Sequence, residues 1–200
     1  WREITDIEQL KQIKSQWEKL NLTQNEFQLF NNPVWIFSWL ETFWQKNWHL
    51  KVLTAWNNEE LIAIAPCYYQ QSFPFSLRSL YPLGQGEIES QEISSEYLDI
   101  LFHKNSPPDI EHKILDWFKD LNVDQISWRA LTSQSHAAKI LNNMNTKSNV
   151  NTATRYVVDC QSWSTTLLSK NMRSRYRRGL NQLEKLKAKI DWVKKEDFDK

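Results

Sequence analysis

A run of basic side chains on a helical pattern is the feature of this sequence most able to do chemistry. Between residues 168 and 189, apolar residues recur every three or four positions, which places them on one face of a helix. The members of this apolar seam are Met172, Tyr176, Leu180, Leu183 and Leu186. Basic residues surround the seam: Lys170, Arg173, Arg175, Arg177, Arg178, Lys185, Lys187 and Lys189. The pattern indicates either contact with an anionic ligand or a connection to a further domain.

Two carboxylates, Glu96 and Asp99, lie at the start of a predicted strand over residues 97–102. Side chains three positions apart on a strand point to opposite faces, so both can line one site only if the strand is bulged. One of them, facing a cleft, can receive a substrate amine. The alternative is that both belong to the solvated edge of a sheet.

The remaining reactive residues form no recognisable site. The histidines have no metal-ligand or catalytic spacing, and the sequence contains no nucleophile elbow and no P-loop. We expect surface or loop positions for His49, His103, His112 and His136. Cys67 and Cys160 are far apart and are expected to be buried thiols in a reducing compartment. Nucleophilic and metal-based catalysis are therefore not expected.

Gly84-Gln85-Gly86 is a candidate anion-binding turn, because glycine-flanked amides at a helix N-terminus can hold a pyrophosphate. That mechanism needs a helix directly after the glycines. The segment that follows, residues 87–92, carries three glutamates and would repel a phosphate. We therefore predict a flexible loop over residues 84–95.

Apolar periodicity predicts the elements that position these residues. Helices are expected over residues 5–20, 32–44, 106–121, 135–144 and 168–189. Strands are expected over residues 50–56, 61–69, 77–83, 97–102, 125–131, 154–160 and 190–193. Thr5-Asp6-Ile7-Glu8 has the form of a capping box, and Asn32-Pro33 that of an N-cap followed by proline. The order predicts an α/β fold, a mixed sheet with helices on both faces.

Composition and charge narrow the function classes. The chain has 200 residues, 40% of them hydrophobic, which suits one globular domain or slightly more. Residues 161–200 carry 11 Lys and Arg against 5 Asp and Glu, whereas residues 1–160 carry 14 against 19. The local positive charge argues against a nucleic-acid interface across the whole domain. No apolar run approaches the ~20 residues of a membrane helix, and there is no signal-peptide pattern, so a cytoplasmic, bacterial-type protein is expected.

Several short sequence motifs occur in a characteristic order along the chain. They are Phe37-Ser38-Trp39-Leu40, the hairpin Leu50–Ala55 with Leu61–Pro66, Ser95-Glu96-Tyr97-Leu98-Asp99, Ser162-Trp163, Leu167–Arg173, and Arg177-Arg178 through Leu183-Glu184. In this order the chain resembles the N-terminal half of bacterial GNAT-type acyltransferases of the FemAB-like/CelD-like group.

The resemblance implies a GNAT-like domain over residues 1–160, followed over residues 161–200 by a basic connecting helix and the start of a truncated second GNAT-like domain. It implies an N-acyltransferase that moves an acyl group to an amine from acyl-CoA, such as acetyl-CoA, or from aminoacyl-tRNA, without a metal. Positioning, a polarising backbone amide and one general base can supply most of the acceleration, because a thioester has a good leaving group. No catalytic residue is identified.

Site residues follow from the same resemblance. The anionic donor is expected to contact Lys170, Arg173, Arg177 and Arg178, and the amine to contact Glu96 or Asp99. The sequence departs from the usual GNAT pyrophosphate loop, because Tyr81 stands where a basic or amide residue should precede Gly84-Gln85-Gly86. We therefore expect this chain to lack most of the donor site and to be weakly active or inactive alone.

Two other interpretations of the basic helix stay open. In one, the chain is a non-enzymatic module that binds nucleic acid or an acidic partner through residues 170–189, with Tyr176 stacking on a base. Against it, Tyr176 lies on the apolar seam, and the rest of the chain is acidic. In the other, the basic residues are simply a solvated helix face.

Overall fold

The structure, a computed structural model, describes residues 1–24, 29–72, 77–144, 147–154 and 161–189. Its contacts divide the chain into two compact units, Trp1–Lys147 and Ser148–Lys200. The domain boundary expected between residues 160 and 161 stays a prediction.

A mixed sheet forms the centre of the first unit, as predicted. Its strands are β1 (Arg2–Ile4), β2 (Trp48–Asn57), β3 (Glu60–Ser72), β4 (Leu77–Pro82), β5 (Leu101–Phe102) and β6 (Gln125–Ile126). The order is β1-β2-β3-β4-β6, and β5 pairs with β3 beyond the end of β4. Among the described pairs, only β4 and β6 run parallel.

The two longest strands of this sheet, β2 and β3, form a hairpin. Asn57 pairs with Glu60, and Asn58 between them adopts a left-handed φ of 54°, so the predicted hairpin is confirmed. Along β3, Ile64 and Tyr68 enter one buried cluster, whereas the alternating Ala63 and Cys67 enter the other. This strand is therefore covered on both faces, which explains its almost continuously apolar sequence.

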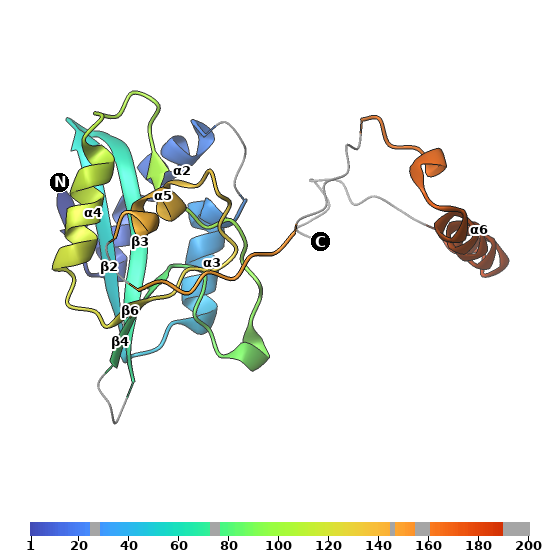
Figure 1. Ribbon diagram of the computed structural model, residues 1–200, viewed down its shortest axis with the longest axis horizontal. Helices are drawn as coiled ribbons and strands as arrows, with labels where there is room; N and C mark the ends of the chain where they lie inside the picture. Colours follow the sequence, from blue (N-terminus) through green and yellow to red (C-terminus); the bar gives the residue numbers. More distant parts are fainter. Residues whose placement is uncertain (25–28, 73–76, 145–146, 155–160, 190–200) are drawn as a thin grey trace. The chain divides into compact units, whose positions relative to one another are not determined.

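Helices cover both faces of the sheet, which confirms the predicted architecture (Figure 1). One face packs against α1 (Ile7–Gln12), α2 (Lys14–Leu22) and α3 (Pro33–Phe43). The opposite face packs against α4 (Ile110–Asp120) and α5 (His136–Asn142). Two short 3-10 helices lie in the connections: η1 (Leu29–Asn31) between α2 and α3, and η2 (Glu89–Gln91) between β4 and β5.

Helix starts are set by short polar side chains. Asn32 Oδ1 accepts a hydrogen bond from the Val34 N–H at 2.8 Å, with Pro33 in the first turn, as expected. The single helix predicted over residues 5–20 is instead two helices, because the chain leaves helical geometry at the β-branched Ile13. Its cap is Asp6, which accepts from the Gln9 N–H.

Two predicted strands are shorter than expected. Residues 97–100 and 127–131 are irregular, because Tyr97 and Ala130 adopt left-handed φ angles of 57° and 55°. The Tyr97 N–H donates to Ala130 O at 3.1 Å. This hydrogen bond, rather than regular strand pairing, joins the two irregular segments. Residues 155–160 and 190–193 lie outside the described residues.

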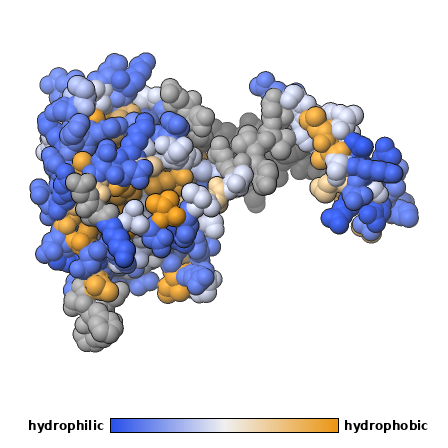
Figure 2. Space-filling model, viewed as in Figure 1, coloured by the Kyte–Doolittle hydropathy of each residue, from blue (hydrophilic) through white to orange (hydrophobic). Residues whose placement is uncertain are grey.

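The second unit contains η3 (Thr165–Leu167) and α6 (Lys170–Lys185), which begins after the Ser169 cap and is shorter than the helix predicted over residues 168–189. The apolar seam of α6 is 39–77% exposed. Hydrophilic side chains cover much of the rest of this helix (Figure 2). No helix in the described part of the chain is long and apolar enough to cross a membrane.

Candidate active site

The candidate site lies where β4 and β6 part, at the carboxyl end of this parallel pair. The pairing covers only Ser79 with Gln125 and Leu80 with Ile126. Beyond it, β4 continues along β3 as far as Leu83, whose N–H donates to Pro66 O at 2.8 Å. The ends of neighbouring strands in α/β sheets are common places for ligand binding.

Gly84-Gln85-Gly86 is not the flexible loop that the sequence predicted. Gln85 is buried, and its carboxamide bonds to the backbone of Ser95 and of Arg129. Both glycines have positive φ, 102° and 97°. A Cβ on Gly86 would lie 2.3 Å from Tyr68 Oη, so only glycine fits there without displacing its neighbours.

Left-handed backbone is concentrated around Gln85. Besides the two glycines, Ser94, Tyr97 and Ala130 have φ angles of 51°, 57° and 55°. Such conformations are costly for residues with a Cβ and persist where the surroundings fix them. Here the fixing contacts are the Tyr97–Ala130 bond and the Gln85 carboxamide.

Glu87 is the functional candidate that the sequence did not single out. Its side chain is 8% exposed, and Oε1 accepts a hydrogen bond from Trp39 Nε1 at 3.0 Å. Oε2 is buried and has no hydrogen-bond partner among the described residues. Native structures rarely leave such an atom unpaired, so it marks a position where function is worth testing. The signal in the sequence was a carboxylate directly after a Gly-x-Gly turn.

Aromatic rings lie beside Glu87. Tyr68 packs against Trp39 and Trp48 with ring centroids 5.6 and 4.8 Å away, and against Tyr81 at 5.8 Å. The Tyr68 hydroxyl donates to Gln85 O at 2.6 Å. Burial raises the pKa of Tyr68, so this phenol stays neutral and acts as a hydrogen-bond donor.

Asp99 is buried, and its carboxylate joins its own segment to the start of α5. Oδ1 accepts from the N–H groups of Ile100 and Ala137 at 2.8 and 2.7 Å, and Oδ2 accepts from the His136 N–H at 3.0 Å. Asp99 thus caps α5. Burial raises the pKa of Asp99, although the three N–H donors and His136 oppose that rise.

The structure does not bring Glu96 into the Asp99 network. Glu96 is exposed, whereas Asp99 is 6% exposed and has its oxygens engaged by backbone. The two side chains therefore differ in environment, as their spacing of three suggested. Amine binding by either residue stays a prediction.

The four basic residues expected to contact the donor lie on α6. Lys170, Arg177 and Arg178 are exposed. Arg173 is half-buried, and its Nη1 donates to Thr166 O and Leu168 O at 3.1 and 2.6 Å. Arg173 therefore fastens the η3 turn to the start of α6, a structural role that the sequence did not reveal. Donor contact by the four residues stays a prediction.

The other reactive residues show no catalytic grouping. In the residues that the structure describes, no group of three His, Cys, Asp or Glu side chains could hold a metal ion. His136 Nδ1 lies 3.0 Å from Glu111 Oε1, at a half-buried position rather than on the open surface. Cys67 is buried as expected, and burial raises its pKa; Cys160 lies outside the described residues.

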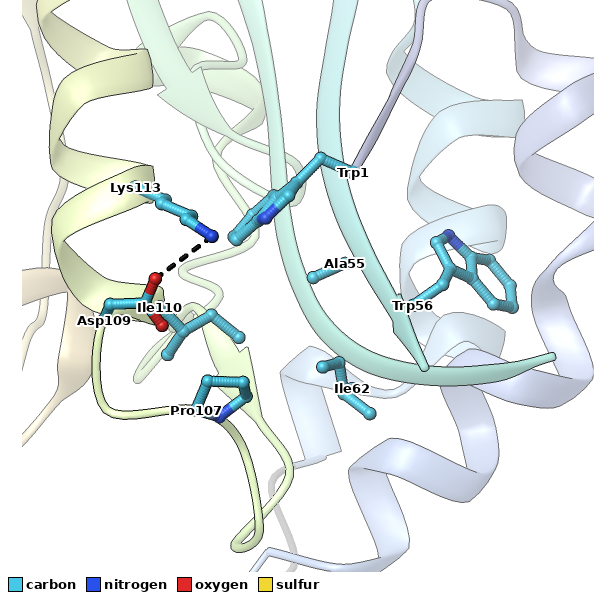
Figure 3. Close-up of a pocket in the computed structure, with 8 residues that line it drawn as sticks. All are labelled: Trp1, Ala55, Trp56, Ile62, Pro107, Asp109, Ile110 and Lys113. Carbon is cyan, nitrogen blue, oxygen red and sulfur yellow. Dashed lines mark ion pairs between the residues drawn. The ribbon is translucent and has the colours of Figure 1, made fainter. Parts of the chain in front are cut away.

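A small cavity of about 120 Å³ lies on the α4 side of the sheet (Figure 3). Trp1 closes one side of it, and Asp109 and Lys113 form an ion pair of 3.0 Å at its edge. Lys113 Nζ lies 5.9 Å from the Trp1 ring centroid. Ligand pockets are usually about 300 Å³ or larger. This cavity is therefore not a candidate for the active site.

Solved structures that are similar to this chain include two acetyltransferases, so described. One, described as a probable acetyltransferase, is 10% identical with a TM-score of 0.39, over 80% of this chain and 99% of that chain. The other, from Bacillus subtilis and likewise provisionally described as an acetyltransferase, is 8% identical with a TM-score of 0.37, over 79% of this chain and all of that chain. No family model and no curated protein matches the sequence.

Proposed function

We propose that this chain is part of an N-acyltransferase of the GNAT type, which moves an acyl group from acyl-CoA to an amine. The observation that carries the proposal is Glu87, a buried carboxylate two residues after Gln85, whose Oε2 has no hydrogen-bond partner among the described residues. Acylation of an amine needs a group that accepts the ammonium or amide proton, and a positioned carboxylate is suited to that role.

In the proposed reaction the amine nitrogen attacks the thioester carbonyl, the bond from carbon to sulfur breaks, and CoA leaves as its thiolate. The proton released by the amine passes to the Glu87 carboxylate. Half-buried Trp44 and Tyr81 flank this region and offer apolar surface to the acceptor. Since no covalent protein intermediate is required, the lack of a nucleophile motif in the sequence is compatible with this class.

We further propose a tandem, cytoplasmic enzyme of the FemAB-like/CelD-like group, in which α6 leads toward a second GNAT-like domain. The exposed seam supports this proposal, because Met172, Tyr176 and Leu180 are 43–49% exposed on one helix face. Contiguous exposed apolar side chains mark interaction surfaces. On the basic side, Lys170, Arg173 and Arg177 follow at i, i+3 and i+7, so they share one face that can meet the donor phosphates.

The first test of the tandem arrangement is the coding sequence downstream of Lys200. A second series of strands and helices with a GNAT-like site supports it, and a stop codon contradicts it.

The test of the donor role uses Arg177→Ala with Arg178→Ala, since Arg173 also has a structural role. We expect at least a tenfold rise in KM for acetyl-CoA, with little change in thermal stability, because exposed charges contribute little to folding. The matched control is Lys46→Ala with Lys104→Ala, which removes the same charge from exposed positions of the first unit. Equal KM values for both double variants would refute donor contact by α6.

The exposed arginines also suit the alternative function, a non-enzymatic module that binds nucleic acid. That alternative predicts binding of the chain to single-stranded or double-stranded nucleic acid with a steep dependence on salt. Binding that is absent at 50 mM salt would exclude it.

A further inference from the structure

The parallel ladder between β4 and β6 ends for a chemical reason. Arg78 O accepts from the Asp124 N–H, and Leu80 O from the Ser127 N–H, both at 2.9 Å. In the register of Leu80 with Ile126, the next step requires an N–H from Pro82. Proline has none, so the ladder cannot continue and the two chains part.

A side chain takes the place of the missing β4 peptide. Gln85 Oε1 accepts the Arg129 N–H at 3.0 Å, and Gln85 Nε2 donates to Arg129 O at 3.0 Å. These are the two bonds that a neighbouring strand would make with Arg129. The second Nε2 hydrogen goes to Ser95 O at 2.9 Å. A carboxamide satisfies this set because it has two N–H donors and an acceptor, whereas a carboxylate has acceptors alone.

The frame around this carboxamide does not depend on the Gln85 side chain. Tyr68 Oη donates to the backbone oxygen of Gln85 at 2.6 Å, and Gln70 Nε2 donates to Gly86 O at 2.7 Å. The segments that carry Ser95 and Arg129 are joined by the hydrogen bond from the Tyr97 N–H to Ala130 O. Loss of the side chain therefore leaves a cavity with its polar atoms in place.

We propose that the backbone groups of Arg129 and Ser95 form a binding slot for a primary carboxamide, which the native chain fills with Gln85. In the native chain the gap between β4 and β6 is thereby closed to an extended ligand, including the amide-bearing arm of CoA. Donor binding then falls to residues outside this gap. The slot itself does not depend on acyl transfer, so it can be tested separately.

The test is chemical rescue of Gln85→Ala in the full chain, followed by thermal unfolding. Without an added amide, we expect the midpoint to fall by about 3–10 °C, because one N–H and two carbonyls lose their partner. Acetamide supplies the atoms that the substitution removes, and it is expected to recover part of this loss in a saturable manner. Acetate has the same shape but cannot donate, so it is expected to recover nothing.

Two control proteins make the result specific. The wild type and Gln45→Ala, which removes an exposed carboxamide outside this frame, keep the slot filled by Gln85, so acetamide is expected to leave their midpoints unchanged or slightly lowered. If Gln85→Ala does not fold in buffer, recovery of folded protein in acetamide but not in acetate supports the slot. Equal effects of acetamide and acetate, or equal stabilisation of the wild type, would overturn it. Pantetheine is expected not to shift the thermal midpoint of the wild type, because Gln85 closes the gap. A saturable shift of the wild-type midpoint that becomes larger in Gln85→Ala would show that the native gap is open to an extended ligand, and would contradict this part of the proposal.

Discussion

Glu87 and Asp99 are both buried carboxylates, but their oxygens differ in what they contact. Asp99 uses both oxygens to accept three backbone N–H groups, whereas Glu87 accepts one bond from Trp39 and its other oxygen has no hydrogen-bond partner among the described residues. A fully bonded carboxylate stabilises the fold, and an unpaired one costs stability. The two residues therefore call for opposite predictions.

Glu87→Gln is expected to preserve or raise stability, by up to about 1 kcal/mol, while acyl transfer falls at least tenfold. Glutamine keeps an acceptor for Trp39 Nε1, removes a buried charge and cannot take a proton from the amine. Urea unfolding measures the first effect, and the rate of acetyl transfer by the tandem protein measures the second. A variant with unchanged transfer would remove Glu87 from the proposed mechanism.

Asp99→Asn is expected to lower the free energy of unfolding by about 1–3 kcal/mol, because its amide N–H₂ would face a backbone N–H. Burial raises the pKa of Asp99 in the folded chain, so its contribution is fully present below about pH 4 and is lost as pH rises through the folded pKa. The stability difference between wild type and variant should therefore narrow with rising pH, as urea unfolding at several pH values can check. A difference that widens with pH would mean that the three N–H donors outweigh burial.

At the scale of elements, α6 differs from the helices of the first unit because packing does not stabilise its apolar face within the described residues. Met172, Tyr176 and Leu180 are all more than 40% exposed. In such a helix, propensity and capping contribute a larger share of stability. The Ser169 cap and the bonds from Arg173 to Thr166 O and Leu168 O hold its first turn.

Gly179→Ala is expected to stabilise α6 locally by about 0.5–1 kcal/mol, since glycine is a poor helix former. A Cβ at Gly179 would meet no atom within 4 Å. Amide hydrogen exchange of α6 is the measurement, and slower exchange is the expected result. The control is Gly86→Ala, which is expected to destabilise the first unit because its Cβ would collide with Tyr68 Oη. Faster exchange in α6 of Gly179→Ala would contradict the prediction.

At the scale of the whole molecule, both buried clusters lie within the first unit. One gathers the helices α1 to α3 on the sheet, and the other gathers α4 and α5 on the opposite face. Among the residues that the structure describes, the last one packed against either cluster is Met144. The stability of the sheet should therefore not require the second unit.

A fragment of residues 1–147 is accordingly expected to fold alone, with a thermal midpoint within about 2 °C of that of the full chain. Calorimetry of both proteins tests this expectation. A fragment that unfolds more than about 5 °C below the full chain would show that residues 148–200 contribute to its core.

The sequence by itself determined the local elements and the fold class. Apolar periodicity and caps such as Asn32-Pro33 fix helices, and the apolar strand predicted over residues 61–69 requires cover on both faces, so a mixed sheet between helices follows. The break at Ile13 and the shortened strands did not follow, because they depend on distant partners such as the Tyr97–Ala130 bond.

Only the tertiary structure decided the roles of individual polar residues. Gln85 meets Arg129, 44 residues away, and Glu87 meets Trp39, 48 residues away. Neither pairing leaves a periodic trace, because each depends on where strands end and not on spacing along the chain. For the same reason the sequence located Asp99 but not its three backbone donors, two of which come from the start of α5.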